Sequence, residues 1–92
     1  MNTEYSEETI KTMVHMGILG YDVEKCLNIV EVEDEQQFKK DFETPGSAIA
    51  KAYKKGKDKA DYAIDMKLFE KAKSGDLKAL QKYEERKEYG KS

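Results

Sequence analysis

The apolar residues of this chain recur at helical spacing, in blocks that turn-forming residues separate. In the first block Ile10, Met13, Val14 and Ile18 follow the three- and four-residue spacing of one helix face. Ser6 precedes them as a good N-cap, and glycines follow at 17 and 20. The pattern predicts a helix from Ser6 to the segment 17–20, and the same spacing along the chain predicts an all-α fold.

Two shorter helices are expected next. Asp22 can cap a short helix with Val23, Cys26, Leu27 and Val30 on one face, and Tyr21 can pack back on Cys26 as a hydrophobic staple. The end of this helix stays open, since the NIVEVE stretch at 28–33 alternates and is β-branched, which could give an extended turn before Asp34. Asp34, with Gln37 three residues later, has the pattern of a capping box, and the helix after it, about 35–42, is expected to bury its two phenylalanines.

A long lysine-rich helix should begin at Thr44-Pro45, because proline suits the first turn of a helix and disfavours helical geometry before itself. At a rise of 1.5 Å per residue, about 28 residues would span roughly 42 Å. Gly56 inside it indicates either a close helix crossing or a break into two helices. The expected inward stripe consists of Ile49, Ala52, Tyr53, Gly56, Ala60, Ala63, Ile64, Leu68 and Ala72.

A short final helix is predicted after Ser74-Gly75, with Asp76 as its cap and Leu77, Leu80 and Tyr83 on its apolar face. At 92 residues, the chain is expected to form one helical domain. Residues 1–44 would form a three-helix unit of the helix-turn-helix kind. Residues 45–92 would add the long helix and the short C-terminal helix, as a region for oligomerisation or DNA contact.

Charge divides the chain into two unlike halves. Residues 1–46 hold four lysines and eleven acids, a net charge of −7, whereas residues 47–92 hold thirteen lysines or arginines and eight acids, a net charge of +5. This asymmetry predicts either an acidic-to-basic contact, within or between subunits, or an anionic partner for the basic half.

The sequence offers no set of residues for catalysis, a metal or a cofactor. The single cysteine, Cys26, lies on an apolar face and is expected in the core, and the lone His15 has no second ligand at metal-binding spacing. No glycine motif for nucleotide phosphates is present. Without a signal peptide or an apolar run near 20 residues, the expectation is a cytoplasmic protein that is not an enzyme and has no membrane partner.

Five lysines fall within nine residues of the long helix: Lys51, Lys54, Lys55, Lys57 and Lys59. Clustered cations can neutralise nucleic-acid phosphates, with an affinity that falls as salt rises. The alternative is an ordinary solvated helix face, since acids are interspersed along the same helix, as Lys57 with Asp61 and Asp61 with Asp65 indicate.

The segment GYDVEKCLNIVEVEDEQQFKKDF looks like a helix-turn-helix, and KAYKKGKDKADYAIDMKLFEKAKSGDLKALQKYEER resembles the region C-terminal to that motif in phage terminase small subunits. There a basic helix leads through an A-x-x-G-[ND]-x-x-A-L pattern, here residues 72–80, into a last short helix. The resemblance implies recognition of double-stranded viral DNA, a homo-oligomer of ring-like form, and a phage motor ATPase as partner in a bacterial host cell.

Carried over by position, Gln36 and Gln37 would read adenine, and Lys39 and Lys40 would touch phosphate. The departure from the family pattern is a run of acids around the start of this helix, Glu31, Glu33, Asp34 and Glu35, which a duplex would repel. Either the lysine-rich helix holds the DNA, or the N-terminal unit binds protein.

Two functions are consistent with these observations. The first is a non-enzymatic DNA-binding accessory protein of a phage or mobile element, which positions viral DNA for packaging. The second is a helical protein-interaction module, virion-associated or inhibitory, in which the −7 half docks on the +5 half of a neighbour or on another partner.

Overall fold

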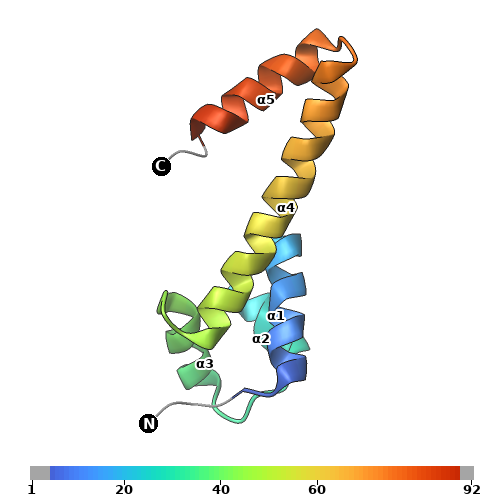
Figure 1. Ribbon diagram of the computed structural model, residues 1–92. Helices are drawn as coiled ribbons and strands as arrows, with labels where there is room; N and C mark the ends of the chain where they lie inside the picture. Colours follow the sequence, from blue (N-terminus) through green and yellow to red (C-terminus); the bar gives the residue numbers. More distant parts are fainter. Residues whose placement is uncertain (1–4, 90–92) are drawn as a thin grey trace. The chain divides into compact units, whose positions relative to one another are not determined.

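A computed structural model describes residues 5–89 of the chain, and within that range its regular structure is entirely helical (Figure 1). The helices, in chain order, are α1 (Glu7–Leu19), α2 (Val23–Ile29), α3 (Glu35–Glu43), α4 (Ala48–Lys73) and α5 (Leu77–Tyr89). The all-α fold that the apolar spacing predicts is confirmed.

Helix α1 begins and ends at the predicted capping residues, and α2 begins at its predicted cap. The Ser6 side chain accepts a hydrogen bond from the Thr9 N–H, and the Asp22 side chain accepts one from the Lys25 N–H at 2.9 Å. Gly20 ends α1 in the left-handed conformation, at φ 71°, which glycine adopts without the steric cost of a Cβ.

Helix α3 starts at the expected cap, but the capping box is formed only in part. The Asp34 Oδ1 atom accepts from the Gln37 N–H at 3.0 Å. The Gln37 amide does not return to Asp34: its Nε2 donates to Asp41 Oδ1, one turn further on, at 2.9 Å. The Gln37 side chain, which a capping box would direct to the Asp34 backbone, is thus hydrogen-bonded to the Asp41 carboxylate four residues later.

Helix α4 begins later than the sequence indicates. Thr44 to Ser47 form a turn, in which the Ser47 N–H donates to the Thr44 carbonyl at 3.0 Å, so Pro45 lies before the helix rather than in its first turn. Ser47 acts as the cap, because its Oγ accepts from the Ala50 N–H at 3.0 Å. The prediction of a helix starting at Thr44-Pro45 was therefore wrong by one turn.

A close crossing of α1 and α4 resolves the two alternatives for Gly56, since α4 runs without a break from Ala48 to Lys73. Gly56 is buried against α1: a Cβ built there would lie 1.9 Å from the Val14 carbonyl oxygen. Gly17 is buried on the other side of the contact, where a Cβ would lie 2.0 Å from the Tyr53 carbonyl oxygen. Two glycines thus let the two backbones approach directly.

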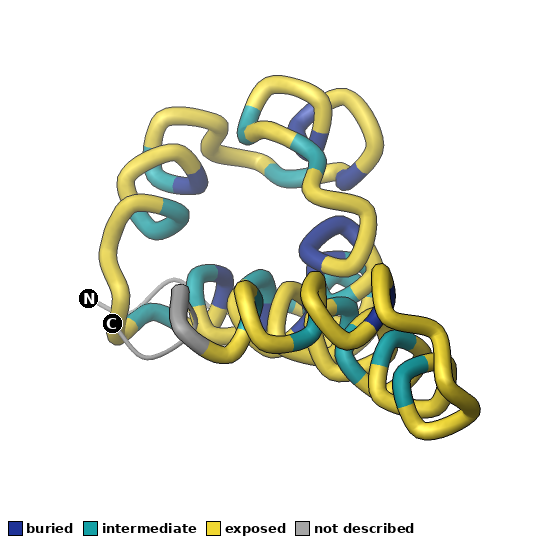
Figure 2. Tube along the Cα trace, turned by 90° about the horizontal axis from the view of Figure 1, so that it is seen from above, coloured by how far each residue is buried: buried dark blue, intermediate teal, exposed yellow. Residues whose placement is uncertain are grey.

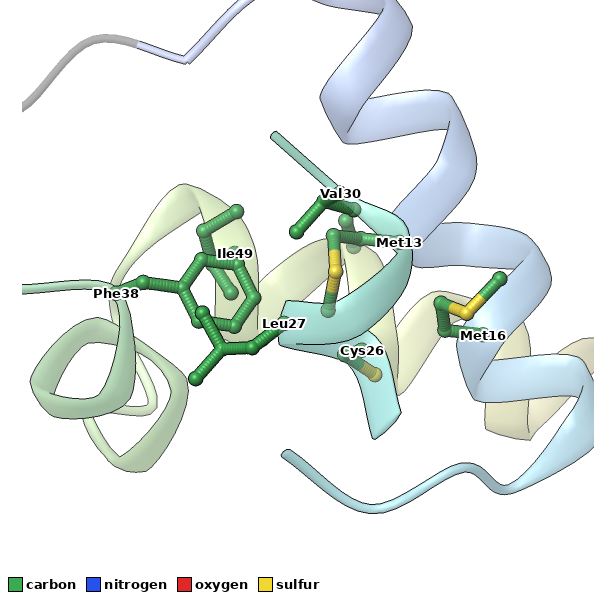
Figure 3. Packing of buried hydrophobic residues seen from close by; sticks show 8 residues of the cluster. Met13, Met16, Cys26, Leu27, Val30, Phe38 and Ile49 are labelled. Atoms are coloured by element: carbon green, nitrogen blue, oxygen red, sulfur yellow. The ribbon is translucent and has the colours of Figure 1, made fainter. Parts of the chain in front are cut away.

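The core lies among α1, α2, α3 and the first half of α4. Figure 3 shows Phe38 and Ile49 packed against Leu27, with Met13 and Val30 beside them. The fully enclosed side chains include Cys26, as its apolar face predicts. Partly buried aromatic rings extend this core: Phe42 stacks edge-on with Tyr53, with ring centroids 4.8 Å apart.

The chain divides into two compact units, and the boundary falls inside α4, after Ala60. A division at residues 44 and 45 would separate Ile49, Ala52 and Gly56 from the core in which they are buried. The predicted inward stripe holds only up to the boundary. Beyond it Ala63 and Ile64 are exposed, and Leu68 and Ala72 are half-buried. Figure 2 shows that buried stretches of the trace are short and that most of it is exposed.

The second unit consists of the rest of α4 and α5. The Asp76 side chain caps α5 by accepting from the Ala79 N–H at 3.0 Å, as predicted, but the helix is longer than expected and continues to Tyr89. Its expected apolar face is only partly correct. Tyr83 packs against Phe69 with ring centroids 5.6 Å apart, whereas Leu77 is 78% exposed and Ala79 takes the buried position.

Candidate nucleic-acid interface

Four of the predicted lysines share one side of α4, here called the lysine face: Lys51, Lys54, Lys55 and Lys59. At about 100° per residue, Lys51, Lys55 and Lys59 advance by only about 40° from one to the next, and Lys54 lies beside Lys51. Ile49 points about 160° away from Lys51, into the core. The burial of the opposite side of the helix therefore turns Lys51, Lys54 and Lys55 outward, and Lys59, about 80° from Lys51, lies at the edge of the face. All four are exposed.

The charge of this segment is strongly positive and mostly unpaired. Residues 47–60 hold five lysines and one acid, a net charge of +4. Lys54 donates to Asp58 at 3.1 Å, across one helical turn. Among the ion pairs of residues 5–89, none involves Lys51, Lys55, Lys57 or Lys59. These four ammonium groups are available to an anion.

Lys57, the fifth predicted lysine of α4, is exposed on a different side of the helix. It lies about 40° from Tyr53, on the side that crosses α1. It also lies about 60° from Lys54 but about 160° from Lys55 and Lys59, so it borders the lysine face only at the Lys54 edge.

The two predicted base-reading residues on α3 differ in exposure and in hydrogen bonding. Gln36 is exposed, whereas Gln37 is half-buried and its amide is held by Asp41. Asp41 also accepts a hydrogen bond from the Tyr5 hydroxyl, which fixes the acceptor of Gln37 in place. Of the two amides, only that of Gln36 stands free of a side-chain partner within residues 5–89.

The predicted phosphate contacts of α3 are likewise unequal. Lys39 forms an ion pair with Glu24 of α2, with its Nζ 2.9 Å from Oε1, and this hydrogen bond raises the pKa of Lys39. Lys40 is exposed in the last turn of α3. Sequence reasoning missed the Lys39–Glu24 pair because the partners belong to different helices, fifteen residues apart.

Acidic side chains surround the start of α3, as the sequence indicates. Glu31, Glu33 and Glu35 are exposed, and Asp34 is exposed while capping the helix. Two adjoining hollows of about 430 and 370 Å³ open beside them and share Ser6, Thr9 and Glu31 as lining residues. The first also holds Glu8 and Ile29, and the second Glu33 and Asp34. We call these two adjoining hollows together the acidic groove. The acidic residues were evident from the sequence, but the groove that they line was not.

Other chemistry is sparse in the part of the chain that the structure describes. Residues 5–89 contain no group of three or more histidine, cysteine or acidic side chains arranged to hold a metal ion. Cys26 is fully buried, and burial raises the pKa of its thiol, while His15 is exposed. None of the described helices combines the length and apolar character needed to cross a membrane.

The structure thus gathers the lysines of α4 on one surface and leaves the α3 candidates on another helix, two of them held by carboxylates. Comparisons with protein-family models, with curated proteins and with solved structures found no match to this chain.

Proposed function

We propose that this chain is a non-enzymatic DNA-binding accessory protein that contacts double-stranded DNA through the lysine face of α4. The observation that carries the proposal is that face: four exposed lysines on a continuous helix, in a segment with a net charge of +4. Binding phosphates there releases counterions, which favours association at low salt. The side of α4 that carries Ile49 and Ala52 is buried in the core, and this burial holds the lysine face toward solvent.

The resemblance to phage terminase small subunits suggests the biological process in which this DNA contact would act. On that basis we propose a protein of a phage or mobile element that positions viral DNA, with delivery to a motor ATPase as the further step. This part of the proposal depends on the sequence pattern of residues 72–80 and on the order of the helices.

A homo-oligomer is the form in which we propose that the protein acts. Among the described side chains of the second unit, Ala79 is the one buried apolar residue, while a set of large apolar side chains is exposed: Tyr62, Ile64, Met66, Phe69, Leu77 and Leu80. Residues 61–89 carry seven basic and seven acidic residues, so two copies would meet without net repulsion. Association would also multiply weak lysine contacts along one duplex.

The DNA contact is tested by fluorescence anisotropy with a generic 30-base-pair duplex over a salt series. A Lys51, Lys55 and Lys59 triple alanine variant is compared with a Lys11, Lys78 and Lys82 triple alanine variant, which removes the same charge from exposed helical positions elsewhere. We expect the first variant to lose about tenfold or more in affinity near 50 mM salt and the second to lose much less. Absence of binding at low salt, or equal losses, would overturn the proposal.

The oligomer is tested separately by sedimentation velocity. A Tyr62→Glu, Leu77→Glu variant places charges on the exposed apolar surface and should shift the protein toward monomer, whereas His15→Glu, on α1, should leave the association state unchanged. A wild-type protein that stays monomeric at high concentration would contradict this part of the proposal.

The groove beside α3 favours a second candidate, a protein-interaction module. Glu8, Glu31, Glu33 and Asp34 line it together with the exposed Ile29, which suits a basic, partly apolar helix such as the +5 half of a neighbour. Self-association that dissolves in high salt, with no effect of DNA, would favour this function over the first.

A further inference from the structure

We infer that the lysine face binds DNA through its phosphates alone and does not read the base sequence. The inference rests on the DNA contact proposed above and concerns what that contact can distinguish. It depends on the chemistry of the α4 surface, on the state of the α3 side chains, and on the spacing of the lysines.

Helix α4 lacks the amide side chains that read adenine and the guanidinium fork that reads guanine with fixed geometry. Between Ala48 and Lys73 it contains no arginine, asparagine or glutamine. Asparagine and glutamine form the bidentate contacts that select adenine, and arginine reads guanine with a rigid planar fork. Lysine can also donate to guanine, but its ammonium group is a compact point charge on a flexible stem with freely rotating donors, which suits phosphate oxygens as well as a base edge.

Helix α3 does not supply the missing readout. The Gln37 amide donates to Asp41, and Lys39 is paired with Glu24, so both would have to break an internal contact to reach DNA. Gln36 is free, but its neighbour Glu35 and the nearby Glu33 are exposed carboxylates that phosphates would repel. The acidic groove beside this helix extends the same repulsion.

The spacing of the free lysines sets the size of the contact. Lys51, Lys55 and Lys59 follow one another at about 6 Å along the helix axis, so they cover about 12 Å. Three neutralised phosphates give a slope of log affinity against log salt of about −3. Lys54 contributes less, because Asp58 already holds its ammonium group.

Asp58 is therefore a negative determinant of the same surface. It lies among the lysines, 3.1 Å from Lys54, and its carboxylate faces any phosphate that they bind. An Asp58→Asn variant should bind DNA more tightly, by about threefold or more, and should steepen the salt slope toward about −4 as Lys54 becomes free. An Asp76→Asn variant, which makes the same change outside this segment, should leave both quantities unaltered.

The decisive experiment is selection from a randomised duplex pool with the full-length protein, combined with salt titrations of anisotropy. We expect no enriched sequence, a slope of about −3, and no effect of a Gln36→Ala, Gln37→Ala double variant. An enriched motif that disappears in this double variant would overturn the inference while leaving the proposed DNA binding intact. Failure to bind any duplex at low salt would overturn both, so the two failures can be told apart.

Discussion

Gly17 and Gly56 face each other where α1 crosses α4, and each is packed against the backbone of the opposite helix. A Cβ at Gly17 would overlap the Tyr53 carbonyl, and a Cβ at Gly56 would overlap the Val14 carbonyl. The crossing holds the first half of α4 in the core, with its opposite side outward. The orientation of the lysine face therefore depends on two residues that carry no side chain.

Alanine at either glycine should destabilise the protein, although alanine is the better helix former by about 1 kcal/mol. Overpacking a core costs about 1–3 kcal/mol when side chains can move aside, and here the obstructing atoms are backbone. We expect Gly17→Ala and Gly56→Ala each to lower the free energy of unfolding by at least about 2 kcal/mol net. Urea denaturation followed by circular dichroism measures this change.

Gly46→Ala provides the matched control, because a Cβ there would meet no atom within 4 Å and the residue has no positive φ. Its effect should stay within about 0.5 kcal/mol. An unfolding midpoint that rises in Gly56→Ala would show that the two helices do not cross at this distance.

The start of α4 gives a second prediction. Ser47 accepts from the Ala50 N–H and donates its hydroxyl to the Asp41 carbonyl, so it both caps α4 and ties it to α3. Ser47→Ala should lower the free energy of unfolding by about 1–2 kcal/mol. Pro45→Ala, in the turn before the helix, should change it by less, and an equal loss in the two variants would contradict the assignment of the cap.

Local signals in the sequence predicted most helix ends. Ser6, Asp22, Asp34 and Asp76 each cap a helix as expected, because a cap depends on a few neighbouring residues. The predicted start of α4 was wrong because two candidate starts, Thr44-Pro45 and Ser47, lie within four residues. Proline is favoured in the first turn of helices in general, but the Ser47 hydroxyl accepts a hydrogen bond from an N–H group of α4 itself.

The burial of side chains and the ion pairs between helices could be predicted less well, since both depend on which helices pack together. The periodicity of α4 continues past Ala60, yet Ile64 is 47% exposed because no core lies beside it in its own unit. The exposed lysines could be predicted from the period alone. The Lys39–Glu24 pair could not, because it joins two helices whose relative placement the sequence does not state.

Because of two partly buried tyrosines, Tyr5 and Tyr53, we expect the protein to lose stability at alkaline pH. Burial and the hydrogen bond to Asp41 raise the pKa of Tyr5 well above its ordinary value of 10.0, and burial raises the pKa of Tyr53 in the same direction. The folded state thus holds these protons more tightly than the unfolded chain does. Their contribution is fully present below pH 10 and is lost as the pH rises above it.

The urea midpoint of the wild type should therefore fall as the pH rises above the ordinary tyrosine pKa of about 10. In a Tyr5→Phe, Tyr53→Phe variant the fall should be shallower, whatever the stability at neutral pH. Tyr62→Phe changes an exposed ring and should keep the wild-type slope. If all three proteins show the same slope, these two tyrosines are not the responsible groups.

Arg86 supplies the main polar contact of the second unit between α4 and α5. Its guanidinium donates through Nε to Asp65 and through Nη2 to Asp61 at 3.3 Å, one turn apart on α4. Both carboxylates are substantially exposed, so the pair should contribute about 0.5–1 kcal/mol. With Ala79 as the only buried residue among 61–87, that amount is large for this unit.

Replacing Arg86 should therefore loosen α5 without affecting α1. Hydrogen exchange of the α5 amides should accelerate by about two- to fivefold in Arg86→Ala, and less so in 1 M salt, where the pair is screened. Lys82→Ala, which removes an exposed charge from the same helix, should leave these rates unchanged. Equal acceleration in α1 would mean that the two units open together rather than separately.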